Sequence, residues 1–297
     1  MKLFFRRCIQ LFFRLLPAGA PAFLYGTLFR PVPLRRLAHW VLLRLMPTQT
    51  MFAGVAVALN PRDPVVSGAL AMGAYERHES VFFRSLLQPG MTVVDVGANV
   101  GCYVALAAKG VGPSGTVIAF EPDPENFSFL QATIRLNNFS HVIAIDAAAS
   151  DRIGQGSLFL AVDNKGDHQI YDSGERRIVR PIRLVMLDSV LRERDIQRID
   201  LVKIDVEGAE FSVLRGMTET MRLNPALQMI IEFWPYGLRN AHEDPVAFLQ
   251  LLRSLGFVLS VIDEHGTTIT PDDLHAFVAG FFGKKYCNLY CVRPLYA

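Results

Sequence analysis

From about residue 75 onward, short apolar runs alternate with segments whose apolar residues recur at helical spacing. The runs rich in valine and isoleucine predict buried strands over 92–97, 115–122, 141–150, 199–208 and 227–234. Helices are predicted around them, over 81–87, 104–110, 126–136, 211–221 and 245–257. Such alternation is typical of an α/β fold with a mostly parallel sheet and helices on both faces.

Two pairs of apolar segments do not fit this alternation. Segments 156–162 and 177–187 are separated only by a polar connector, 164–175, which predicts an inserted hairpin. The runs 257–263 and 287–293 predict two more strands without a clear crossover helix between them. We therefore expect these last two strands to form an antiparallel hairpin at the sheet edge.

Acidic residues mark the ends of the expected parallel strands. In open α/β sheets, ligands bind beyond the carboxyl ends of the strands. The acids at these ends are Asp95, Glu121, Asp146, Asp205 and Glu232. Because buried carboxylates are costly without partners, five of them in this pattern predict a ligand site.

The stretch VVDVGANVGCYV (93–104) predicts a strand, a glycine turn and the start of a helix. A dinucleotide loop needs a GxGxxG pattern for close approach of the pyrophosphate, and this turn lacks it. Asp95 would repel phosphate but suits an ammonium group, and Glu121 can accept hydrogen bonds from two ribose hydroxyls. Asp146 could meet an adenine amino group. A ligand with an amine, a ribose and an adenine but no phosphate is S-adenosylmethionine, which these residues favour over NAD.

Several longer motifs carry a resemblance to a known family. They are DVGANVG, FEPDPENFSFLQATIRLN, DAAASDRIG, LDSVL and IDLVKIDVEGAEFSVLRGM. In this order and spacing, over about 75–234, the sequence resembles the FkbM-type S-adenosylmethionine-dependent methyltransferases. The resemblance implies a class I methyltransferase (Rossmann-like) fold. It also implies methylation of a hydroxyl on a sugar, glycolipid, polyketide or other small metabolite.

The predicted cofactor site combines the glycine turn with the next two strand ends. Its residues are Asp95, Gly97, Asn99, Gly101, Glu121, Asp146 and Ala147. Asn99 is expected to cap the helix or to hold the methionine carboxylate. A plain strand-to-helix turn is the alternative interpretation of the glycines, and a loop position is the alternative for Asp146.

The predicted catalytic residues are Lys203, Asp205, Glu207 and Glu232. Strand alternation would place the first three on one side, about 6.7 Å apart in successive pairs. We expect Lys203 to pair with Asp205, Glu207 to contact the acceptor or take its proton, and Glu232 to line the acceptor pocket. An ion pair that only fixes the strand is the alternative for Lys203 and Asp205.

Other interpretations of this region stay open. No metal is assigned from the sequence, although oxygen ligands from Asp205, Glu207 and Glu232 could hold a divalent cation if they converge. Glu210 is expected only to begin the following helix. His168 in the connector is interpreted as a solvated loop histidine, with a general base as the alternative.

The first 60 residues differ from the rest in charge. They hold 8 of the 30 basic residues and none of the 28 acidic ones, leaving 22 basic and 28 acidic residues for the remainder. We predict a basic, amphipathic extension over 1–60 and a methyltransferase domain over 61–297. On a helical wheel, all polar residues of 2–16 share one arc, into which only Leu3 and Phe13 intrude. The stretch 34–46 mixes arginine, histidine and apolar residues in a similar way. This pattern favours a helix on an anionic membrane surface; a helix packed on the domain and a signal peptide are the alternatives.

The cysteine content and the acidic charge of the domain indicate which cellular compartment and which partners to expect. Four cysteines without a CxxC pair favour small buried side chains in a reducing compartment. We therefore expect a cytoplasmic enzyme, peripheral on the inner face of a membrane, with a small-molecule or glycan acceptor. The acidic domain without stacking aromatics argues against the first alternative, an RNA ribose methyltransferase. The second alternative is a non-enzymatic, membrane-tethered binding module, which the intact cofactor motifs disfavour.

Overall fold

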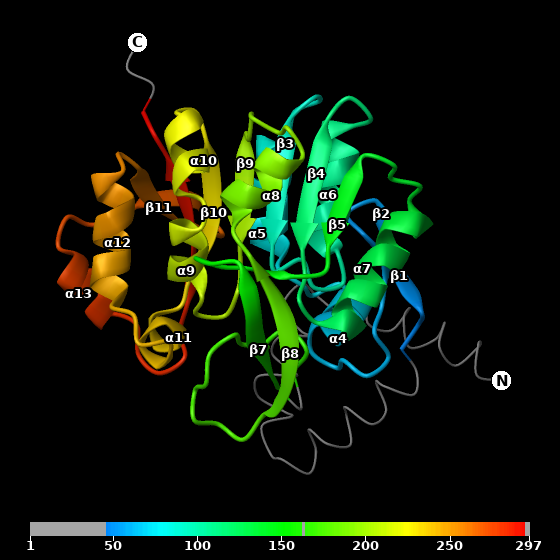
Figure 1. Ribbon diagram of the computed structural model, residues 1–297, viewed down its shortest axis with the longest axis horizontal. Helices are drawn as coiled ribbons and strands as arrows, with labels where there is room; N and C mark the ends of the chain where they lie inside the picture. Colours follow the sequence, from blue (N-terminus) through cyan, green and yellow to red (C-terminus); the bar gives the residue numbers. More distant parts are fainter. Residues whose placement is uncertain (1–45, 162–163, 295–297) are drawn as a thin grey trace.

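The computed structural model describes residues 46–161 and 164–294 and is built around an eight-stranded sheet (Figure 1). The strand order is β12-β11-β13-β10-β9-β3-β4-β5. Five adjacent strands are parallel: β5 (Val142–Ile145), β4 (Thr116–Phe120), β3 (Thr92–Val96), β9 (Leu201–Ile204) and β10 (Gln228–Phe233). This order and direction confirm the predicted class I methyltransferase fold.

Helices cover both faces of the sheet because the parallel strands are apolar on both sides (Figure 1). Along β4, Val117 and Ala119 face one core and Ile118 and Phe120 face the other. The first face carries α5 (Arg77–Leu86), α6 (Cys102–Val111) and α7 (Pro124–Leu136). The second carries α8 (Leu187–Glu193), α9 (Glu210–Arg215), α10 (Thr218–Leu223) and α12 (Pro245–Ser254). Two short helices, α4 (Val66–Met72) and α11 (Pro235–Asn240), precede α5 and α12.

The antiparallel end of the sheet differs in detail from the prediction. β11 (Val258–Asp263) and β13 (Cys287–Val292) pair antiparallel as expected. However, β13 also pairs with β10, so it lies inside the sheet, and the edge hairpin is β11 with β12 (Gly266–Ile269). A six-residue helix, α13 (Leu274–Ala279), connects β12 to β13. One helical turn and a half is too short to leave a clear periodic signal in the sequence.

Two expected elements are broken in the structure. The expected strand 141–150 splits into β5 and β6 (Ala148–Ala149), and the expected helix 211–221 splits into α9 and α10. The helix breaks at Gly216, where an added Cβ atom would overlap the carbonyl oxygen of Ser150, the residue after β6. Glycine therefore permits the close approach of these two chain segments.

The predicted hairpin insertion is present as β7 (Gly154–Leu160) and β8 (Ile178–Val185), which pair antiparallel. With β6 they form a three-stranded sheet that projects beyond the carboxyl ends of the parallel strands (Figure 1). The expected strand 177–187 ends earlier than predicted, since its last residue already begins α8. The connector between β7 and β8 thus lies over the edge where the strand-end acids gather.

The first described residues pack against the methyltransferase body. The hairpin of β1 (Gln49–Phe52) and β2 (Val55–Ala58) lies on α7, where the Ala56 and Ala58 amides donate to Asn137 Oδ1 and Thr133 Oγ1 at 2.9 and 3.0 Å. The predicted helix 2–16 and nearly all of 34–46 lie outside the described residues, and the boundary at residue 60 stays a prediction. Within 46–161 and 164–294, none of the helices has the length and apolar character needed to cross a membrane.

The turn after β3 generates a stability prediction. Gly97 has a φ of 89°, and a Cβ atom there would overlap the carbonyl oxygen of Asp205. Gly73 also has a positive φ, 67°, but nothing lies within 4 Å of the added atom. We expect Gly97→Ala to lower the free energy of unfolding by at least about 3 kcal/mol. Gly73→Ala is expected to cost only about 1–2 kcal/mol, for the left-handed backbone alone. Urea denaturation of both variants would test this, and equal losses would contradict it.

Candidate active site

The glycine turn that follows β3 is hydrogen-bonded to the end of the neighbouring strand, β4. The Gly97 and Ala98 amides both donate to the carbonyl of Phe120, at 3.0 and 2.9 Å. Asn99 follows with a φ of 50°, and Gly101, with a φ of 85°, is the N-cap of α6. The Asn99 side chain therefore does not cap the helix at the N-cap position. Its Oδ1 accepts from the Val100 amide at 2.8 Å.

The Glu121 carboxylate holds two loops together from the end of β4. Its Oε2 accepts from the Asn99 amide and its Oε1 from the Asp123 amide, both at 2.8 Å. The side chain is buried, and this burial raises the pKa of Glu121 to about 8. Since a carboxylate offers about four lone-pair positions, two remain for a ligand.

Asp95 is a buried carboxylate without a hydrogen-bond partner. It is 1% exposed, and both carboxylate oxygens lack a partner among the described residues. Burial raises the pKa of Asp95 to about 6, although the nearby Lys203 opposes the rise. An unsatisfied buried carboxylate indicates that a cationic or hydrogen-bond-donating group is missing from this position.

The predicted pairing of Lys203 with Asp205 is confirmed. Lys203 Nζ donates to Asp205 Oδ2 at 2.7 Å and lies 4.5 Å from the centre of the Tyr103 ring. Burial alone would lower the pKa of Lys203, but Asp205, Asp95 and Glu76 together raise it above its ordinary value. The lysine therefore stays charged and orients the Asp205 carboxylate.

A tight turn, not strand alternation, positions Glu207. The strand β9 ends at Ile204, and Glu207 and Gly208 have φ values of 56° and 103°. As expected, Glu210 begins α9, and its Oε1 accepts from the Val206 and Gly208 amides at 3.3 and 3.0 Å. Tyr171 of the connector donates to the Glu207 carbonyl oxygen at 2.7 Å. Hydrogen bonds to the Glu210 carboxylate and from the Tyr171 hydroxyl thus hold the turn.

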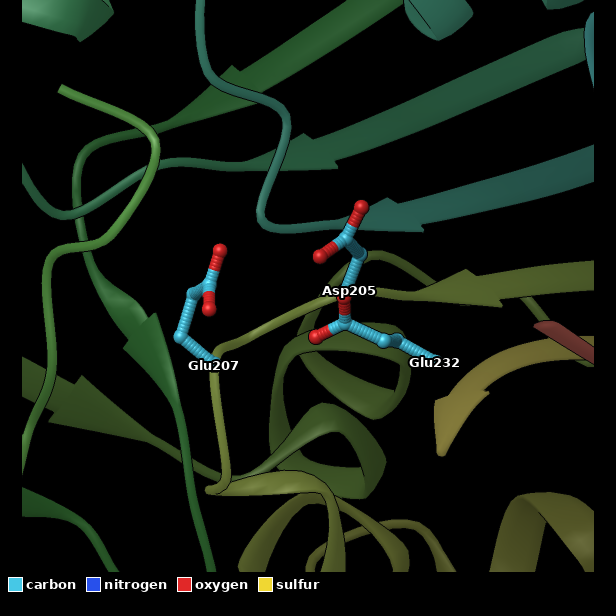
Figure 2. A group of neighbouring side chains, drawn as sticks. All are labelled: Asp205, Glu207 and Glu232. Carbon is cyan, nitrogen blue, oxygen red and sulfur yellow. The ribbon is translucent and has the colours of Figure 1, made fainter. Parts of the chain in front are cut away.

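Three predicted catalytic carboxylates converge beyond β9 and β10. Figure 2 shows Asp205, Glu207 and Glu232 pointing towards a common space, and one oxygen of each lies within 4.8 Å of the others. At an effective dielectric of 20, like charges this close repel by about 3 kcal/mol or more per pair. Burial, and next the neighbouring carboxylates, raise the pKa of Glu207 and Glu232 well above the usual range.

Two adjoining cavities contain most of the predicted site. A narrow cavity of about 60 Å³ lies over the end of β4 and includes Glu121 and Ala147. An acidic cavity of about 320 Å³ includes Asp95, Lys203 and Glu232. Five residues line both cavities: Gly97, Asn99, Gly166, Asp205 and Glu207. A separate hollow of about 620 Å³, between β8 and α8, contains none of the predicted site residues.

Two of the predicted cofactor residues, Asp146 and Gly101, line neither cavity. The Asp146 side chain is exposed at the end of β5, whereas the adjacent Ala147 lines the narrow cavity. Gly101 contributes through packing, since an added Cβ would press on Leu130 of α7. A cofactor role for Asp146 stays a prediction.

The interpretation of His168 as a solvated loop residue is wrong. Its side chain is only 7% exposed and lines the narrow cavity, because the connector folds over the sheet edge. The Nδ1 atom accepts from the Ala161 amide at 3.1 Å, and burial lowers the pKa of His168 to about 4. A neutral ring whose acceptor nitrogen is already bonded is a poor general base.

Several site residues were missed from the sequence. Lys165 Nζ lies 3.7 Å from Glu125, and the Lys165 carbonyl accepts from the Asn99 and Asn126 side chains. These contacts close the connector over the cofactor turn. The acidic cavity is also lined by residues from distant segments: Tyr75, Glu76, Tyr103, Trp234, Lys284 and Tyr286. Of these six residues, only Trp234 lies at the end of a predicted parallel strand, two residues after Glu232.

Comparison with known proteins agrees with this geometry. The profile described as "Methyltransferase FkbM domain" matches residues 95–259, which is more than half of the chain. The 31-O-demethyl-FK506 methyltransferase FkbM of Streptomyces tacrolimicus is 33% identical over 228 residues, covering 65% of this chain and 82% of that protein. The chain belongs to the FkbM methyltransferase family. It is an S-adenosylmethionine-dependent methyltransferase, as the resemblance implied.

Two other relatives of this FkbM-family enzyme are similar over shorter stretches. Methyltransferase sdnD of Sordaria araneosa is 29% identical over 180 residues, covering 50% of this chain and 68% of that protein. Hexuronic acid methyltransferase AglP of Haloferax volcanii is 28% identical over 134 residues, covering 43% of this chain and 50% of that protein. The chain thus spans between half and about four fifths of the lengths of these three relatives.

The residues present in the FkbM-family site fit the cofactor. Asp95 offers two unpartnered oxygens for an ammonium group, and Glu121 retains lone pairs for ribose hydroxyls. The narrow cavity, of about 60 Å³, is lined by Lys165, Gly166 and His168 of the connector.

The two backbone bonds to Glu121 predict the effect of an isosteric change. In Glu121→Gln, the amide NH₂ must face either the Asn99 or the Asp123 N–H, so that one buried donor loses its acceptor. We expect a loss of about 1–3 kcal/mol in unfolding free energy. Cofactor affinity, measured by calorimetry, is expected to fall at least about tenfold, since the loss of one hydrogen bond to a charged group corresponds to ~1.5–3 kcal/mol. An unchanged affinity and melting temperature would contradict the proposed double role.

Proposed function

We propose that this FkbM-family enzyme methylates a hydroxyl group of a small, hydroxyl-rich acceptor such as a sugar, glycolipid or polyketide. One observation carries the proposal. The converging carboxylates of Asp205, Glu207 and Glu232 share the acidic cavity with Asp95. A hydroxyl that attacks a methyl group must lose its proton, and carboxylates in the same cavity can receive it.

The chain's residues are proposed to hold the cofactor at three points. Asp95 binds the ammonium group, Glu121 the ribose hydroxyls, and Ala147 packs beside the adenine, with Asp146 as a further contact. Bound S-adenosylmethionine supplies an electrophilic methyl group on its sulfonium. Gly97 lines both cavities. The cofactor is proposed to extend from the narrow cavity towards the acidic one.

The acidic cavity is proposed to bind and orient the acceptor. Lys203 fixes the Asp205 carboxylate, and Glu207 or Glu232 accepts a hydrogen bond from the reacting hydroxyl. Alignment of the hydroxyl oxygen with the methyl group contributes most to the rate of such a displacement. Trp234 and Tyr286 add aromatic surface to the cavity wall, which suits the apolar face of a sugar ring.

The relatives support this acceptor class without naming the acceptor. One relative is a methyltransferase of 31-O-demethyl-FK506, and another is a hexuronic acid methyltransferase. An RNA acceptor is disfavoured, since the phosphates of a nucleic acid would be repelled by the carboxylates that line the cavity.

The proposed reaction can be tested by mass spectrometry. Lipid, glycan and metabolite extracts from cells with and without the protein are compared for molecules that differ by one methyl group. We expect a methyl ether in the presence of the wild-type chain, and none with Asp95→Ala or Glu121→Ala. Methylated RNA would favour the alternative acceptor. A folded wild-type chain that fails to bind labelled S-adenosylmethionine would overturn the proposal.

The raised pKa of Asp95 predicts a pH dependence of cofactor binding. Below pH 6 the carboxyl takes up a proton and loses its charge, whereas the cofactor ammonium stays charged. Affinity is therefore expected to rise with pH up to about 6, by as much as about tenfold per unit, and then to level off. Calorimetry between pH 5 and 7.5 would measure this. In Asp95→Asn the rise should be absent, and a rise of the same size in that variant would assign it to another group.

We also propose that the basic extension holds the enzyme on an anionic membrane surface. The support is the sequence of residues 2–16, whose polar residues share one arc of a helical wheel, and of 34–46, which mixes arginine, histidine and apolar residues. Flotation with anionic liposomes should carry the intact chain but not a chain that begins at residue 47, just before the described β1–β2 hairpin. Equal partitioning of the two chains would remove this hypothesis.

A further inference from the structure

The converging carboxylates of the acidic cavity have the geometry of a cation site. One oxygen from each of Asp205, Glu207 and Glu232 lies within 4.8 Å of the other two (Figure 2). Oxygens bound to one Ca²⁺ at 2.3–2.6 Å can be up to about 5 Å apart, and a smaller ion needs only slight closure. We propose that these three carboxylates bind a divalent cation.

The Glu232 side chain gives independent support for a missing ligand. The residue is 8% exposed, yet Oε2 has no hydrogen-bond partner among the described residues. Figure 2 shows this carboxylate facing the space between Asp205 and Glu207. Buried carboxylate oxygens are normally paired, so the free oxygen indicates a positively charged group at this point.

The other two carboxylates also keep an oxygen available. Lys203 occupies only Oδ2 of Asp205, which leaves Oδ1 for an ion. The bonds from Tyr171 and to Glu210 hold the backbone around Glu207, and none of the hydrogen bonds within 46–161 and 164–294 uses its carboxylate. Lys203 therefore holds the Asp205 carboxylate, and Tyr171 holds the backbone of Glu207, before an ion arrives.

The excess of carboxyl groups over lysines in the acidic cavity also favours a bound cation. Six carboxyl groups line this cavity, and only two lysines: Glu76, Asp95, Asp167, Asp205, Glu207 and Glu232 against Lys203 and Lys284. Lys284 pairs with Glu175, which lies outside this lining. The carboxyl groups therefore outnumber the lysines, and a divalent ion would offset part of this excess.

The ligand type indicates which cations suit the site. All three proposed ligands are carboxylates, and neither histidine nor cysteine joins the cluster among the described residues. Hard oxygen ligands select Mg²⁺, Mn²⁺ or Ca²⁺ over Zn²⁺ or copper. The remaining coordination positions would be open to water and to a hydroxyl oxygen, since three protein ligands leave such an ion incomplete.

This inference deepens the proposed function, because a cation there would bind the acceptor hydroxyl and lower its pKa. Its existence can be tested without cofactor or acceptor. Mn²⁺ is titrated into the intact, EDTA-treated chain at neutral pH, and free Mn²⁺ is followed by electron paramagnetic resonance. We expect one Mn²⁺ per chain, displaced by excess Mg²⁺ or Ca²⁺.

Glu-to-Gln variants of matched side-chain volume test which carboxylates bind the ion. Glu232→Gln and Glu207→Gln keep the side-chain volume, and each should weaken Mn²⁺ binding at least tenfold. Glu76→Gln removes a carboxyl from the same cavity but outside the three-residue cluster, and should change the affinity less than about fivefold. Calorimetric binding of S-adenosylmethionine to each variant confirms that it is folded.

The outcomes separate the two proposals. Wild-type chain that binds no more Mn²⁺ than Glu232→Gln overturns the cation site, and an equal loss in Glu76→Gln assigns the effect to general charge instead. Methyl transfer that persists in EDTA, without Mn²⁺ binding, would leave a carboxylate as the base. Mn²⁺ binding without methylation of any hydroxyl would keep the site and overturn the proposed function.

Discussion

The contact between the ends of β3 and β9 determines how the active site is built. The Asp205 amide donates to the Val96 carbonyl at 3.0 Å, and only a glycine at position 97 leaves room for the Asp205 carbonyl oxygen. This contact fixes Asp95 opposite Lys203 in the sheet, with Asp205 two residues further along the chain. Two carboxylates and an ammonium group are thereby held close together in the acidic cavity, and Asp205 also lines the narrow one.

Carboxylates at neighbouring strand ends have different roles because their oxygens have different partners. Glu121 and Glu210 each accept two backbone amides, so they hold the turns that shape the site. Glu121 and Glu210 thus stabilise the loops, and Glu121 keeps lone pairs for a ligand. Both oxygens of Asp95 and Oε2 of Glu232 have no partner among the described residues, and Oε2 of Glu210 has none either. This division follows from the hydrogen bonds and not from the residue type.

The inserted hairpin completes a site that the sheet alone would leave open. Its connector contacts Asn99 of the glycine turn through Lys165 and the Glu207 turn through Tyr171. The same connector buries His168 against Asp123, with 3.8 Å between Nε2 and Oδ2. A single surface insertion therefore shapes both cavities, and its sequence is a natural place for variation in acceptor specificity.

The sequence by itself determined the parallel core, the glycine turn and the acids at the strand ends. These features depend on local patterns, namely apolar runs, glycine spacing and the residue that follows each run. The tertiary structure decided which acids converge. Glu232 meets Asp205 because β10 lies beside β9, and Glu207 joins them through a left-handed turn that strand alternation did not predict. It also decided that His168 is buried and that β13 lies inside the sheet. Long-range packing sets these positions, and no short segment of the chain encodes it.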